Sequence, residues 1–85
     1  MRVWKPSAEE IKATEKWGEW SKEVSDFPWY YDDTETCYIL EGEATVKDSN
    51  GNEVHFGKGD MVQFKQGVKC TWNIRRDIRK KFIFG

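Results

Sequence analysis

Apolar and polar residues alternate with a period of two along most of the chain, which is the pattern of half-buried β-strands. The alternation predicts strands over residues 18–25, 35–47, 54–56, 61–64, 70–74 and 79–84. We expect the last two to form a hairpin around Arg76-Asp77. The aromatic segment 27–31 contains Pro28, which restricts this segment to the start of a strand or to a sheet edge.

The strongest predicted strand, 35–47, changes face at Gly42. Before the glycine, Glu35, Cys37 and Ile39 share one face. After it, Ala44 and Val46 form the apolar set. A one-residue shift of face at a glycine is typical of a β-bulge or a sharp bend, so we expect the strand to be interrupted there.

Turn residues separate the predicted strands. Asn50-Gly51 is a strong short hairpin signal, and glycine turns follow at 57–60 and 66–67. Near the N-terminus, Ser7 and Glu10 have the spacing of a capping box, which predicts one short helix over about 8–14. Short strands, regular turns and one peripheral helix predict an all-β fold, a small antiparallel barrel in which 1–85 form a single domain.

The charge balance narrows the classes of partner. Lys and Arg number 14 against 15 Asp and Glu, for a net charge of −1, so we expect no general attraction to nucleic acid or to an anionic membrane. No apolar run approaches the roughly 20 residues of a membrane span, and no segment resembles a signal peptide. A cytoplasmic protein is therefore expected.

Cysteine and histidine are scarce. A disulfide between Cys37 and Cys70 is arithmetically possible, but an intracellular domain normally keeps such residues as thiols. His55 is the only histidine. One imidazole cannot replace the three that many metal sites require.

Two stretches have spacings that identify a family. Glu35 is followed by six residues and Gly42, and farther on Gly59 is followed by seven residues, Gly67, two residues and Cys70. These stretches, ETCYILEGEATV and GKGDMVQFKQGVKC, resemble the two signature motifs of the cupin superfamily. The resemblance covers about residues 28–85. It implies a jelly-roll barrel with an interior pocket.

Within that superfamily, the run EVSDFPWYYDDTETCYILEG, from Glu23 to Gly42, is similar to very short single-domain cupins, mostly of unknown function. These are grouped by sequence with ureidoglycine aminohydrolase and the ethanolamine-utilisation cupins. The resemblance implies the subgroup, and also that some aromatic surface serves homodimer formation. It does not imply a reaction.

The chain departs from the superfamily pattern at every metal-binding histidine. By position, Glu35 takes the place of the glutamate ligand and Cys70 that of the third histidine. The paired histidines would fall, depending on the spacer, at Pro28 and Tyr30 or at Trp29 and Tyr31. Lys65 replaces the proline of the second motif. Because neutral imidazoles are the main ligands in such a site, we expect no histidine metal site and no cofactor.

The barrel register implied by the resemblance turns Glu35, Cys37 and Cys70 inward. Glu35 is then either a general acid/base or ligand anchor, or a carboxylate retained from metal-binding ancestors and satisfied by neighbouring aromatic side chains. For the cysteines three interpretations stay open: a reactive thiol, a thiolate metal site shared with Glu35, and inert buried residues that only pack.

Aromatic and basic residues supply the remaining candidates. Those that can line a pocket mouth and stack on a flat ligand, or simply fill the core and an interface, are Trp20, Trp29, Tyr30 and Tyr31. Trp72 alternates with Cys70 and is expected to pack inside the barrel. The basic run 75–81 is either a solvated hairpin or an anion-recognising rim in which Arg79 or Lys80 faces a ligand carboxylate or phosphate.

Three hypotheses on function follow. The leading one is a metal-independent cupin that binds a small molecule, anionic or neutral. The candidate binding residues are Glu35, Cys37, Cys70, Trp29, Tyr31, Trp72, Arg79 and Lys80. The first alternative is a small enzyme on a polar or nitrogenous metabolite, with Glu35 as proton-transfer group and Cys70 as nucleophile or second acid. The second alternative is a homodimerising interaction module.

Overall fold

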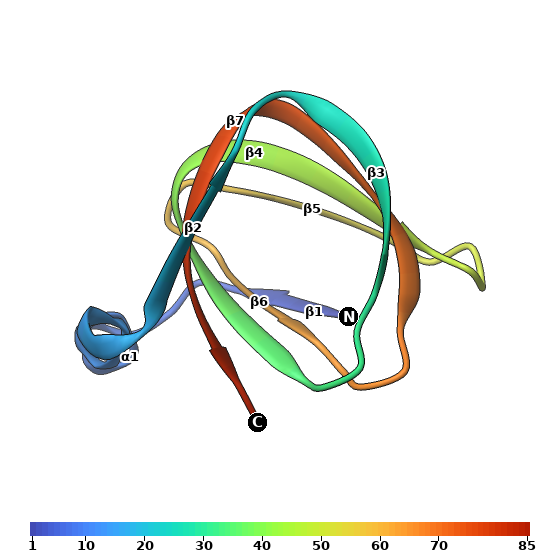
Figure 1. Cartoon of the computed structure of the whole chain (residues 1–85). Coiled ribbons are helices and arrows are strands. Elements are labelled where there is room, and N and C mark those ends of the chain that lie inside the picture. The colour runs from blue at the N-terminus through green and yellow to red at the C-terminus, as the bar shows by residue number, and fades with distance from the viewer.

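The computed structural model describes residues 1–85, and its strands curve around a central interior (Figure 1). In chain order the elements are β1 (Arg2–Trp4), α1 (Ala8–Ala13), the 3₁₀ helix η1 (Thr14–Lys16), β2 (Gly18–Lys22), β3 (Ser25–Tyr30), β4 (Glu35–Asp48), β5 (Glu53–Gly57), β6 (Met61–Phe64) and β7 (Lys69–Phe84). The predicted all-β fold with one short N-terminal α-helix is confirmed.

All strand pairs are antiparallel, and the long strands β4 and β7 organise the sheet. The strand order is β1-β6-β4-β7-β2, with β3 added to β7 and β5 added to β4. β2 pairs with the C-terminal part of β7 and β3 with its N-terminal part. In the same way, β6 pairs with the N-terminal part of β4 and β5 with its C-terminal part. Since each long strand changes partners along its length, the sheet curls into a barrel.

The predicted hairpin around Arg76-Asp77 is wrong. Residues 69–84 form one continuous strand of 16 residues, which pairs with β4 along almost its whole length. The break in alternation at 75–77, where all three residues are exposed, comes from irregular pairing with the bulged part of β4. A bulge interrupts the alternation as a turn does, but it bends the strand without reversing it.

The predicted interruption at Gly42 is confirmed. The β4–β7 register shifts between Ile39 and Ala44, and Gly42 has a φ of 90°. A Cβ at this position would lie 2.8 Å from the backbone oxygen of Arg76 and closer still to that of Asp77. Glycine is therefore required both by its backbone conformation and by the close approach of β7.

The N-terminal elements agree with the prediction, except that the predicted strand 18–25 is divided between two strands. The Ser7 hydroxyl accepts a hydrogen bond from the Glu10 amide at 3.1 Å, and the Glu10 carboxylate accepts one from the Ser7 amide at 2.9 Å, which confirms the capping box. The predicted strand 18–25 ends at Lys22, and β3 begins at Ser25. β3 pairs only with β7, so Pro28 lies on an edge strand as expected.

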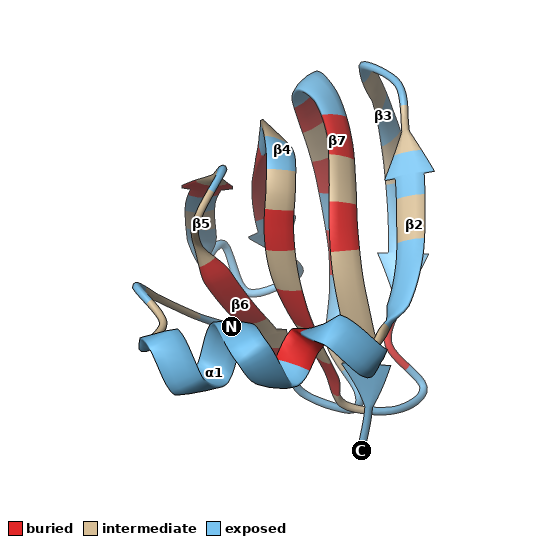
Figure 2. Cartoon of the chain, turned by 90° about the vertical axis from the view of Figure 1, so that its left-hand side faces the viewer, coloured by how far each residue is buried: buried red, intermediate tan, exposed pale blue.

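The core is an aromatic and aliphatic cluster enclosed by β4, β5, β6 and β7. Buried positions alternate with more exposed ones along β4 and β7, whereas α1 is exposed (Figure 2). Glu35, Cys37 and Ile39 are all at most 5% exposed, which confirms that they share the inward face. Trp72 is 2% exposed and contacts Phe56 and Phe64 with ring centroids 5.4 and 5.5 Å away.

Candidate functional site

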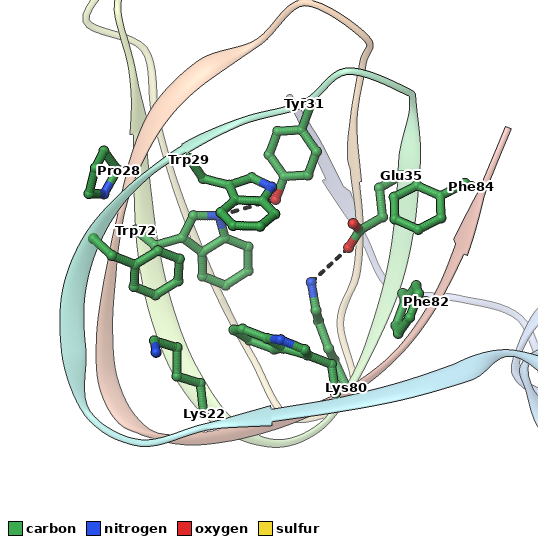
Figure 3. A pocket seen from close by; sticks show the side chains of 11 residues that line it. Lys22, Pro28, Trp29, Tyr31, Glu35, Trp72, Lys80, Phe82 and Phe84 are labelled. Atoms are coloured by element: carbon green, nitrogen blue, oxygen red, sulfur yellow. Dashed lines mark hydrogen bonds and ion pairs between the residues drawn. The ribbon is translucent and has the colours of Figure 1, made fainter.

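A pocket of about 520 Å³ opens into the barrel and is lined by residues of β2, β3, β4 and β7 and by Tyr31, which directly follows β3 (Figure 3). Its walls are mainly aromatic. The lining residues are Trp20, Lys22, Phe27, Pro28, Trp29, Tyr31, Glu35, Trp72, Lys80, Phe82 and Phe84. Six of the candidates named from the sequence are therefore brought together: Trp20, Trp29, Tyr31, Glu35, Trp72 and Lys80.

A buried ion pair joins two of these residues. The Lys80 ammonium donates a hydrogen bond to Oε2 of Glu35 at 2.7 Å, and both side chains are only 7% exposed. The Cys37 thiol donates to the same oxygen at 2.8 Å, and Lys80 Nζ lies 3.4 Å from Cys37 Sγ. The carboxylate that the superfamily resemblance assigns to a metal is thus bound by an ammonium and a thiol.

Two indole rings complete the surroundings of Lys80. Its ammonium lies 4.8 Å from the ring centre of Trp20 and 5.0 Å from that of Trp72. Aromatic faces attract a cation, most strongly where water is excluded. Together with Glu35 they offset part of the desolvation cost of placing an ammonium in an apolar pocket.

Tyr31 fixes the opposite wall of the pocket. Its ring stacks on Phe64 with centroids 4.6 Å apart, and its hydroxyl accepts a hydrogen bond from the Trp72 indole nitrogen at 3.1 Å. Burial, with a smaller contribution from the Glu35 charge, raises the pKa of the Tyr31 phenol above its ordinary value. The hydroxyl therefore keeps its proton and can donate it in a hydrogen bond.

Neither cysteine lines the pocket. Cys37 is fully buried behind Glu35, and burial raises the pKa of its thiol above the ordinary value. Burial also raises the pKa of Cys70 to about 11, aided by the Asp48 charge, and the Cys70 thiol donates to the Trp29 backbone oxygen at 3.6 Å. Both are free thiols that stay protonated at neutral pH, a poor state for a nucleophile or a metal ligand.

The donor set does not fit the metal that the superfamily resemblance implies. No group of three or more His, Cys, Asp or Glu side chains is arranged to hold an ion. His55, the only imidazole, is 67% exposed on β5, where it contacts Thr45 and Glu53. The interpretation of Glu35, Cys37 and Cys70 as a shared thiolate metal site consequently has no support in the geometry.

Arg79 lies on the outer face of β7. It contacts Glu41 at 3.0 Å and Glu19 at 3.6 Å, and the Glu41 hydrogen bond raises the pKa of the guanidinium. Because side chains alternate along a strand, Lys80 points into the pocket while Arg79 points away from it. The basic run therefore does not form a continuous rim.

Five lining residues were not identified as site candidates from the sequence: Lys22, Phe27, Pro28, Phe82 and Phe84. A usable signal existed for two of them. Phe82 and Phe84 alternate with Lys80 along β7, so all three are expected on the same face of the strand, and Phe82 pairs with Gly18 of β2 across the sheet. Tyr30, weighed as a mouth residue, is 53% exposed and does not line the pocket.

The chain belongs to the family of EutQ-like cupin domains, whose model matches residues 9–82. Among solved structures it is similar to a DUF861 family protein from Thermotoga maritima, with 43% identity over 99% of this chain and 98% of that one, and a TM-score of 0.95. The resemblance to a small single-domain cupin is thereby confirmed. A search of curated proteins found no match.

Two more distant structures share the fold. One is a putative ethanolamine utilization protein Q from Salmonella typhimurium, at 20% identity over 96% of this chain and 66% of that one, with a TM-score of 0.72. The other is the EutQ protein of Clostridium difficile, at 18% identity over 79% of this chain and 52% of that one, also with a TM-score of 0.72. These likenesses concern the fold alone.

Proposed function

We propose that the chain binds a small organic molecule in the aromatic pocket. The observation that carries this proposal is an open volume of about 520 Å³ walled by aromatic rings, with the Glu35–Lys80 ion pair inside it. Ligand sites are commonly concave and mostly apolar, with a few polar groups that fix orientation. A barrel that served only as a scaffold has no need to keep a buried ion pair beside an open space.

The tryptophans supply a direct test of binding. Trp20, Trp29 and Trp72 line the pocket, whereas Trp4 and Trp17 do not. In an NMR screen of aromatic and carboxylate fragments, we expect the indole N–H signals of the first three to shift and those of the other two to stay in place. Fragments that shift no pocket signal, or that shift all five equally, contradict the proposal.

Two neighbouring residues give a matched pair of variants. Trp29 and Tyr30 are each 53% exposed, but only Trp29 lines the pocket. Since an aromatic stack contributes roughly 0.5–1.5 kcal/mol, Trp29→Ala should weaken the binding of a fragment by about two- to tenfold. Tyr30→Ala should leave the dissociation constant unchanged. Equal effects of the two substitutions would place the ligand elsewhere.

The alternative proposal is a metal-independent enzyme that uses Glu35 for proton transfer. It is favoured by the placement of a carboxylate in an apolar pocket beside Lys80, a second proton-transfer group. Cys70, proposed as nucleophile or second acid, does not line the pocket. The nitrogenous substrate suggested by the resemblance to ureidoglycine aminohydrolase stays a prediction. Once a substrate is found, unaltered turnover by Glu35→Gln would dispose of this alternative.

Homodimer formation also stays a prediction. The residues that leave large apolar surface exposed are Ile11, Val24, Trp29, Tyr30, Ile83 and Phe84. Sedimentation analysis at micromolar concentration tests it, and a monomer would count against an interaction module.

The structure has no helix long and apolar enough to cross a membrane.

A further inference from the structure

We propose that the pocket selects a planar organic monocarboxylate, with its carboxylate at Lys22 on the rim and a hydrogen-bond donor group at Glu35 inside. This inference rests on the proposed binding function and adds the class of ligand. It follows from the polar atoms that the protein leaves without partners in the pocket.

Lys80 is not the cation that a ligand anion would meet. Its ammonium is bound to Glu35 at 2.7 Å and lies over the faces of Trp20 and Trp72. An incoming carboxylate at this point would compete with the Glu35 carboxylate for the same ammonium. Arg79, the other predicted anion-binding residue, is held outside by Glu41 and Glu19.

Lys22 is the unpaired cation of the pocket. None of the ion pairs in the structure includes it, and its ammonium lies 5.2 Å from the ring centre of Phe27. It also borders the surface groove next to the pocket, which places it on the rim. The charged lining residues are two lysines and one glutamate, a net charge of +1 that one carboxylate neutralises.

The inner end of the pocket offers one acceptor and one donor. Only Oε2 of Glu35 is bonded to protein groups, and since no fully buried side-chain oxygen lacks a partner, Oε1 must border the open space. The Tyr31 hydroxyl accepts from Trp72, but its own proton is donated to no protein group. A ligand hydroxyl or N–H group satisfies Oε1 of Glu35, and a ligand oxygen satisfies Tyr31.

The aromatic walls of the pocket favour a flat molecule. Phe27 lies parallel to Trp72, with an interplanar angle of 9° and centroids 6.0 Å apart, and Trp29 stands edge-on to Phe27 at 6.4 Å. Trp29 is half-exposed, so part of its ring surface is available to a ligand. Aromatic faces and edges of this kind bind unsaturated rings better than flexible aliphatic chains.

Three probes separate the parts of this inference. 4-Hydroxybenzoate carries both the carboxylate and the donor group, benzoate lacks the donor, and phenol lacks the carboxylate. Calorimetric titration of the wild-type protein should rank 4-hydroxybenzoate tightest. Lys22→Met keeps the side-chain stem over Phe27 and removes the charge. This substitution should weaken the binding of 4-hydroxybenzoate and of benzoate by about fivefold, which is the upper end of the contribution of a partly exposed ion pair. It should leave the affinity for phenol unchanged.

Lys58→Met is the matched control. Lys58 is exposed in the turn between β5 and β6, outside the pocket and without an ion pair. The Lys58→Met substitution removes the same charge as Lys22→Met and should alter none of the three dissociation constants. If phenol binds as tightly as 4-hydroxybenzoate, or if Lys22→Met and Lys58→Met act alike, the carboxylate class is wrong while the binding pocket stands. If no probe binds and the fragment screen also fails, both proposals fall.

Discussion

Lys80 and Glu35 are 45 residues apart in the chain, yet their side chains meet at 2.7 Å inside the barrel. Lys80 comes from the C-terminal part of β7 and Glu35 from the first residue of β4. The two strands pair antiparallel, with Lys80 opposite Ile39 and Glu35 opposite Phe84. The long β4–β7 pairing therefore creates the polar centre of the pocket.

Removing one member of this pair should strongly destabilise the fold. A buried charge left without its partner costs about 3–5 kcal/mol, so Lys80→Met and Glu35→Gln should each lower the free energy of unfolding by roughly that amount. The Lys80 ammonium left unpaired in Glu35→Gln keeps its contacts with Trp20 and Trp72, so the loss in this variant should lie at the lower end of that range.

The double variant provides the control. Lys80→Met combined with Glu35→Gln leaves no unpaired charge, so it should cost less than the sum of the two single changes. Urea unfolding of the four proteins measures this coupling. Additive effects, or single losses below about 1 kcal/mol, would mean that the pair is not desolvated as described.

The β4–β7 pairing also explains where prediction from sequence succeeded. Alternation identified the inward face at Glu35, Cys37 and Ile39, and the glycine identified the interruption at Gly42, because both are local signals. The capping box was likewise readable from Ser7 and Glu10, which lie three residues apart.

The Glu35–Lys80 pair was not predictable, because it depends on a non-local register. Reading a turn at Arg76-Asp77 would fold 79–84 back on 70–74 and separate Lys80 from β4. Because β7 is instead one continuous strand, its even-numbered residues face inward on both sides of the bulge, and Trp72, Ile78 and Lys80 are all buried. No local signal distinguishes a bulge that bends a strand from a turn that reverses it.

Substitution of Gly42 should be much more damaging than substitution of a turn glycine. Gly42 and Gly51 have nearly equal φ values, 90° and 87°, but a Cβ at Gly51 would meet nothing within 4 Å. Gly51→Ala should cost about 1–2 kcal/mol, the usual penalty for this backbone conformation. Gly42→Ala adds a clash with the β7 backbone and should exceed this clearly in chemical denaturation. Equal losses would show that β7 does not approach Gly42 so closely.

Cys70 should make the stability depend on pH in the alkaline range. The thiol of the unfolded chain loses its proton near the ordinary pKa of 9.0, whereas that of the folded protein does so near 11. Between these values the folded state binds more protons, so the free energy of unfolding falls as pH rises. The stabilisation is fully present below pH 9 and is lost by about pH 11.

The Cys70→Ser variant isolates this contribution, since serine does not titrate there. Its free energy of unfolding should fall less steeply than that of the wild type between pH 9 and 11. Parallel curves for the two proteins would indicate that the Cys70 thiol is open to solvent in the folded state.

The pairing of Glu35 with Lys80 leads to a prediction on metal content. Elemental mass spectrometry of protein purified without a metal-affinity tag should find no near-stoichiometric Zn, Fe, Mn or Cu, and a chelator should not alter the melting temperature. Near-stoichiometric metal would overturn this prediction and would require Lys80 to leave the Glu35 carboxylate.

The decisive measurement is a high-resolution crystal structure of the protein soaked with 4-hydroxybenzoate, which shows whether the pocket is open and how it holds the ligand. We expect an open pocket of about 520 Å³ with the ring against Phe27 and Trp29, the hydroxyl at Glu35 and the carboxylate at Lys22. An interior packed solid, with Phe82 and Phe84 filling the space between Trp72 and Glu35, would contradict it.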